Sequence, residues 1–200
     1  MIMRRSGDLW TEDAQLVLDA REPCIAHAQH WLRTHEWRAR ASQTTADEGP
    51  TIDRAVAFTG FARGEGRGGY FAWVHRYLTR LQGLEVYTAE TGHRPHIIVP
   101  ADAPSYVTES LAFFGYGDVI VEWDRSEDLR IRHAVIPSHR FPERFSRKRG
   151  RQDVSKRVIA PDAAAWLHEK ARRAVDRVDI ELSPRVLISR ADVGRREIAN

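Results

Sequence analysis

The chain has 200 residues, of which 42% are hydrophobic and 30% are charged, and its formal net charge is +3. This length suits one domain, or one domain with a small appendage, and the apolar share is enough for a core. The composition is therefore typical of a folded protein rather than a disordered one. A net charge of +3 creates no field strong enough to dictate a polyanionic partner.

Cysteine use and the N-terminus bear on the cellular compartment. Cys24 is the single cysteine and cannot form an internal disulfide, which favours a reducing compartment. No apolar run approaches the roughly 18 residues that a membrane span needs. The N-terminal segment MIMRRSGDLW lacks the apolar stretch of a signal peptide. The sequence therefore predicts a cytoplasmic protein, and peripheral attachment at the inner face of the membrane stays open.

The first 50 residues are predicted to be an N-terminal appendage and a linker. Residues 14–20 have the composition of a short strand, and residues 25–41 have apolar spacings typical of a helix. The small, polar, proline-ended run 41–50 is typical of a linker.

From Thr51 onward, apolar strands alternate with amphipathic helices. The expected strands are residues 55–60, 96–100, 118–123, 129–137 and 184–190. The expected helices are residues 70–92, a helix that begins near Pro104, and residues 160–175. Because the strand interiors are apolar throughout, the pattern predicts an α/β fold, with a Rossmann-like, mostly parallel sheet and helices on both faces. Residues 51–183 are assigned to this lobe.

A glycine-rich loop, GFARGEGRGG (residues 60–69), lies between the first of these strands and its helix. In this position backbone N–H groups can bind phosphate. The spacing matches neither G-x-G-x-x-G nor a P-loop, so a substrate-facing loop and a plain connector both fit.

Residues 139–157 hold eight Lys or Arg residues against two acids. Such a run can bind nucleic acid through phosphate contacts, although its ordinary interpretation is a solvated surface loop. No RNA-recognition or zinc-finger signature accompanies it, so nucleic acid is not the partner we expect first. The nine histidines are scattered without a metal-binding spacing, so no metal site is predicted.

The last expected strand ends at Arg190 and is followed by Arg195 and Arg196. In open α/β sheets ligands bind at the carboxyl ends of the strands, and guanidinium groups there suit a diphosphate. The competing interpretation is that these arginines are solvent-facing charges at a helix start.

Three pieces of the chain resemble the family 61 glycosyltransferases, the capsular polysaccharide biosynthesis type. The segment LISRADVGRREIAN (187–200) resembles the family's Y-I-S-R…R-R-x-x-N-E segment. The segment GYFAWVHRYLTRL (69–81) resembles its N-Y-Y-H-W-x-x-E-x-L-P-R-L helix. Between them, residues 96–124 and 133–140 are similar to the family's middle section, and the similarity spans roughly residues 52–200.

The resemblance implies the N-terminal lobe of a GT-B glycosyltransferase, with residues 184–200 as the first strand of a second lobe. It implies inverting transfer of a sugar from a nucleotide-diphosphate donor to a hydroxyl of a glycan or lipid-linked glycan, in surface polysaccharide synthesis. No cofactor and no metal are required. The donor diphosphate-binding residues that it implies are Arg190, Arg195, Arg196 and Asn200. The acceptor-side helix residues that it implies are Tyr70, Trp73 and Arg80.

The helix departs from the family pattern at three positions. The family's histidine, glutamate and proline are replaced by Ala72, Arg76 and Thr79, which leaves His75 as the candidate catalytic base. The chain also ends where the second lobe begins and lacks the family's H-G-A segment. We therefore expect a truncated or decayed copy that transfers sugar poorly or not at all. A non-catalytic scaffold in a polysaccharide-assembly complex and a nucleic-acid-binding protein are the alternative functions.

Overall fold

The computed structural model describes residues 1–3, 9–11, 17, 49–59, 69–124, 126, 128–140 and 159–177. Several expected elements lie wholly or almost wholly outside these residues: the strand 14–20, the helix 25–41, the glycine-rich loop, the basic stretch 139–157 and the strand 184–190.

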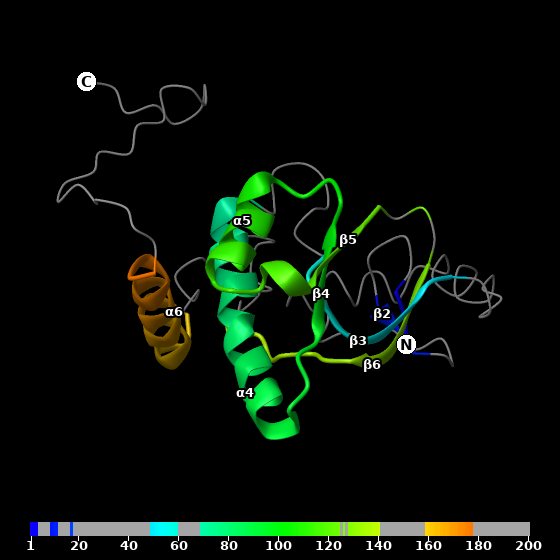
Figure 1. Cartoon of the computed structure of the whole chain (residues 1–200), viewed down its shortest axis with the longest axis horizontal. Coiled ribbons are helices and arrows are strands. Elements are labelled where there is room, and N and C mark those ends of the chain that lie inside the picture. Colours follow the sequence, from blue (N-terminus) through cyan, green and yellow to red (C-terminus); the bar gives the residue numbers. More distant parts are fainter. Residues whose placement is uncertain are drawn as a thin grey trace, which may run out of the picture.

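Six strands form one sheet, in the spatial order β2-β1-β6-β3-β4-β5 (Figure 1). The strands are β1 (Ile2–Met3), β2 (Leu9–Trp10), β3 (Thr51–Ala57), β4 (His96–Pro100), β5 (Ile120–Trp123) and β6 (Leu129–Ala134). The four strands from β3 to β6 are mutually parallel, whereas β1 pairs antiparallel with both β2 and β6. The predicted α/β class with a mostly parallel sheet is confirmed.

The order of the parallel strands defines a topological switch point. The chain passes from β3 to β4 and β5 on one side, and then returns to place β6 on the other side of β3. This 3-2-1-4 order is that of one half of a doubly wound nucleotide-binding sheet, so the fold is compatible with the Rossmann-like expectation. In such sheets ligands bind outside the carboxyl ends of the strands on either side of the switch, here β3 and β6.

Part of the expected N-terminal appendage belongs to the sheet. Met3 pairs with Leu129 of β6 and is fully buried. The amino group of Met1 donates a hydrogen bond to the backbone oxygen of Ile131 at 2.7 Å. Pairing with β1 satisfies the backbone groups of β6 that would otherwise form an open sheet edge.

The described helices all contribute to the core on one face of the sheet. They include α4 (Leu81–Thr91), α5 (Ser105–Phe113) and α6 (Pro161–Val175), with a short 3₁₀ turn, η5 (Gly117–Val119), before β5. Figure 1 shows α4 and α5 beside the sheet and α6 beyond α4. Helices were expected on both faces, but the described residues place a helix on only one of them. The second face carries its own buried cluster: Met3, Leu9, Ala55, Ala57, Ile98, Trp123, Leu129 and Ile131.

The helix expected at residues 70–92 is one helical run with an irregular first half. It begins as α3 (Tyr70–Ala72), widens into a π-helical turn, η3 (Trp73–Tyr77), and tightens into a 3₁₀ turn, η4 (Leu78–Arg80), before α4. The run ends at Gly92, whose φ of 70° lies in the left-handed region that glycine adopts without strain. The expected end is confirmed, whereas periodicity did not predict the wide turn.

None of the described helices combines the length and apolar character that crossing a lipid bilayer requires.

Candidate functional site

Tyrosine and tryptophan aside, the buried polar side chains of the described residues gather at the carboxyl end of β3. They are Thr59, Arg76, Thr79 and Arg80, with exposed fractions of 3%, 8%, 0% and 1%. Thr59 follows β3, and the other three belong to the helical run that packs over that end of the strand. Arginine is rarely buried this deeply unless its charge is paired or hydrogen-bonded. We call these four residues the switch-point cluster.

Arg80 connects the two sides of the switch point. Its Nε donates a hydrogen bond to the backbone oxygen of Pro137 at 3.1 Å, and its guanidinium carbon lies 5.3 Å from the centroid of the Phe58 ring. Phe58 directly follows β3, and Pro137 lies in the segment that follows β6. A cation over an aromatic face is attracted to the ring, so Arg80 is held in place from both strands.

Aromatic packing fixes the helical run against β3. The Phe58 ring makes edge contacts with Trp73 and Tyr77, at centroid distances of 6.1 and 5.5 Å. The indole Nε1 of Trp73 donates to the hydroxyl of Ser110 in α5 at 2.8 Å. Trp73 is fully buried, so the structure places this expected acceptor-side residue in the core.

The π-helical turn contains His75, the candidate base, and Arg76, which stands where the family pattern has a glutamate. Such turns are frequent at functional sites. The backbone oxygen of His75 accepts a hydrogen bond from the Thr79 hydroxyl at 2.8 Å. Thr79 therefore supports the turn by satisfying a backbone acceptor within it.

His75 is half-buried in the π-helical turn. Burial lowers the pKa of its imidazole below the ordinary value of 6.5. Its ring makes an edge contact with Phe71 at a centroid distance of 4.3 Å. A neutral imidazole can accept a proton, so the geometry keeps His75 as a candidate base.

Exposed aromatic rings begin the helical run. Tyr70 is 64% exposed and Phe71 is 52% exposed. Tyr70 makes an edge contact with the Tyr106 ring of α5 at 5.4 Å, which fixes its orientation. Tyr70 is thus the expected acceptor-side residue that a ligand can reach, whereas Arg80 is covered.

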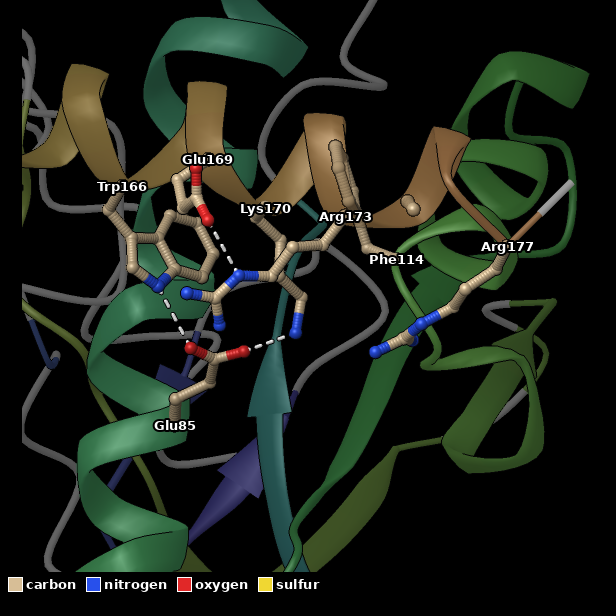
Figure 2. Close-up of a pocket in the computed structure, with 8 residues that line it drawn as sticks. Glu85, Phe114, Trp166, Glu169, Lys170, Arg173 and Arg177 are labelled. Carbon is tan, nitrogen blue, oxygen red and sulfur yellow. Dashed lines mark hydrogen bonds and ion pairs between the residues drawn. The ribbon is translucent and has the colours of Figure 1, made fainter.

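A second polar site, which the sequence analysis missed, lies between α4 and α6. The Glu85 carboxylate accepts a hydrogen bond from Trp166 Nε1 at 2.8 Å and forms an ion pair with Lys170 (Figure 2). These residues line a hollow of about 260 Å³, together with Phe114, Glu169, Arg173, Ala174 and Arg177. We call it the α4–α6 pocket. Only the basic spacing on α6 is visible in the sequence, because Glu85 is 81 residues from Trp166.

A larger hollow of about 580 Å³ lies between α4 and the extended segment after β6. Gly83 permits this close approach, because a Cβ there would lie 2.9 Å from the Cβ of Pro137. The same contact places the Pro137 backbone oxygen within reach of Arg80.

The expected donor-binding residues Arg190, Arg195, Arg196 and Asn200 lie outside the described residues. Within the described ranges, no group of three or more His, Cys, Asp or Glu side chains could hold a metal ion. Arg80 was expected through the resemblance, whereas no role was predicted for Thr59. Arg76 and Thr79 were noted only as departures from the family pattern.

Comparisons with protein-family models, with curated proteins and with solved structures found no match to this chain.

Proposed function

We propose that the chain is the lobe of a glycosyltransferase that transfers a sugar from a nucleotide-diphosphate donor to a glycan hydroxyl. The observation that carries the proposal is the burial of Arg76 and Arg80 beside the carboxyl end of β3. The strand order, with its switch point between β3 and β6, and the resemblance to family 61 glycosyltransferases also support it.

The proposed reaction is a single displacement with inversion at the anomeric carbon. The acceptor oxygen attacks that carbon, and the bond to the donor diphosphate breaks with its electron pair leaving on the diphosphate. His75 takes the proton of the acceptor hydroxyl; burial lowers the pKa of its imidazole and so favours the form that accepts a proton. Tyr70 and Phe71 offer exposed ring faces on which the acceptor sugar stacks.

The cations of the switch-point cluster stabilise the departing diphosphate. Positive groups that are fixed before the reaction lower the barrier most, because they need no reorganisation as charge develops. Arg80 is covered and does not touch the ligand, so it contributes a fixed positive charge behind the site, held in place by its contacts with Phe58 and Pro137. By the resemblance, Arg190, Arg195 and Arg196 bind the diphosphate directly.

The test is titration of the purified chain with UDP, GDP, CDP and ADP by calorimetry. We expect saturable binding of at least one of them, weakened about tenfold or more by Arg76→Gln and by Arg190→Ala. Arg132→Gln is the matched control, because Arg132 is an exposed arginine on β6. Circular dichroism verifies that each variant is folded.

Two results would overturn the proposal. One is the absence of binding tighter than about 1 mM for all four nucleotides. The other is an equal loss of affinity in Arg132→Gln. If nucleotides fail but a DNA or RNA oligonucleotide binds with steep salt dependence, the nucleic-acid alternative replaces sugar transfer.

A further inference from the structure

Three cations line the α4–α6 pocket. Lys170 and Arg173 are three residues apart on α6, which places them on one face of the helix, and Arg177 lies in the turn that follows α6. Figure 2 shows all three side chains on the side that faces Glu85. The cations therefore come from the end of α6 and the turn after it, and the opposing wall comes from α4 and the end of α5.

The carboxylates of the pocket do not balance these cations. Glu85 pairs with Lys170, and Glu169 accepts a hydrogen bond from Arg173 Nε at 2.7 Å. That bond leaves the two terminal nitrogens of Arg173 available. Within the described residues, no carboxylate pairs with Arg177. The lining therefore holds three cations against two carboxylates.

Helix-end electrostatics account for only part of this arrangement. Arg172 and Arg173 occupy the last turn of α6, where positive charge interacts favourably with the helix dipole. Arg177 lies beyond Val175, the last residue of the helix. Its side chain points to the side of the pocket that faces Glu85 (Figure 2), whereas the Arg173 side chain is directed toward Trp166, so an anion bound by both would lie between them.

We propose that the α4–α6 pocket binds a small oxyanion, a phosphate ester or a carboxylate, between Arg173 and Arg177. The apolar part of the ligand packs against Phe114 and beside Trp166. A hollow of about 260 Å³ is large enough for the oxyanion and the apolar part of a small metabolite. This site is distinct from the switch-point cluster and does not depend on the proposed sugar transfer.

Trp166 provides a reporter within the pocket, because its indole N–H donates to Glu85. The experiment records ¹H–¹⁵N spectra of the full chain during titration with phenyl phosphate and, separately, with benzoate. The Trp166→Phe variant identifies the indole signal. We expect that signal to shift saturably with at least one probe. A response to phenyl phosphate alone identifies a phosphate ester as the ligand class, and a response to benzoate alone identifies a carboxylate.

Matched arginine variants of α6 decide whether the pocket is specific. Arg173→Gln and Arg177→Gln should each weaken probe binding about tenfold, the loss expected for one charge-assisted hydrogen bond. Arg172→Gln removes the same charge from the same helix but does not line the pocket, so affinity should be unchanged. Arg76→Gln should also leave affinity unchanged, which separates this site from the switch-point cluster.

The inference is overturned if neither probe shifts the Trp166 signal saturably below about 10 mM. It is also overturned if Arg172→Gln weakens binding as much as Arg177→Gln. That result would mean that the overall charge of α6, and not the pocket, attracts the anion.

Discussion

The switch-point cluster and the α4–α6 pocket use the same side chain in opposite surroundings. Arg80 is 1% exposed, whereas the side chain of Arg173 is 65% exposed. A buried guanidinium has lost its hydration and must keep fixed partners, while an exposed one exchanges partners with water and ions at little cost. The buried arginine of the switch-point cluster therefore holds a positive charge at a fixed place, whereas the exposed arginine of the α4–α6 pocket can bind a ligand.

The largest effect is expected from Arg80→Ala, which removes the buried cation. The variant loses the hydrogen bond to Pro137 and the packing on Phe58, and it leaves a cavity beneath the helical run. The free energy of unfolding should fall by about 3 kcal/mol, measured by urea denaturation. The exposed Arg132→Ala should change it by less than about 0.5 kcal/mol. If the free energy of unfolding of Arg80→Ala also changed by less than about 0.5 kcal/mol, the buried arginine would contribute no more to stability than an exposed one.

Glu85→Ala tests the contact that joins α6 to α4 in the exposed region. The variant removes an acceptor from Trp166 and the ion-pair partner of Lys170, both of which keep partial access to water. We expect a loss of about 1–2 kcal/mol in the free energy of unfolding, smaller than for Arg80→Ala. The control is Glu90→Ala, an exposed glutamate of the same helix. Equal losses in the two variants would mean that Glu85 does not hold α6.

Gly83→Ala tests how tightly the segment after β6 packs against α4. The added Cβ would lie 2.9 Å from the Cβ of Pro137, which is a rigid neighbour. The steric cost should exceed the gain in helix propensity, for a net destabilisation of about 1 kcal/mol. Gly69→Ala is the control, because a Cβ there meets nothing within 4 Å. A stabilised Gly83→Ala protein would show that this segment moves away without cost.

The smallest effect concerns the pH dependence of the α6 surface. Hydrogen bonds from Arg172 and Arg173 lower the pKa of Glu169 from 4.5 to about 2. The stability that this carboxylate contributes is therefore complete above pH 4.5 and is lost as the pH falls through 2. A ¹³C titration of the Glu169 carboxyl should give a midpoint near 2, rising in Arg173→Gln. A midpoint of 4.5 in the original chain would show that these surface bonds do not persist in solution.

Local pattern was enough for some of the described elements but not for all: β3 begins four residues before the expected strand 55–60 and ends at Ala57, and β1 and β2 were not expected. The strand at residues 96–100 was predicted with its observed bounds, and α6 was predicted within one residue of its start. Apolar periodicity and end signals act within a few residues of each other, so the sequence reveals them directly. Strand order was not predicted, because pairing joins distant segments such as Ala55 and Ala134.

The sites were harder to predict because their contacts are distant in sequence. Arg80 meets Pro137 across 57 positions, and Trp166 meets Glu85 across 81. No spacing rule joins such pairs. The burial of Arg76 and Thr79 also has no local signal, since apolar periodicity marks only apolar side chains as buried.

The π-helical turn at Trp73–Tyr77 sets the angular relation between the two halves of the helical run. Each residue of a regular α-helix advances the direction of its side chain by about 100°. Deleting one residue within this turn would allow an unbroken α-helix to form, but His75 and Arg76 would then lose the positions that the wide turn gives them. Folding therefore does not require this segment to keep its length, whereas the geometry of the ligand site does. A shortened chain could fold and still fail to bind the ligand.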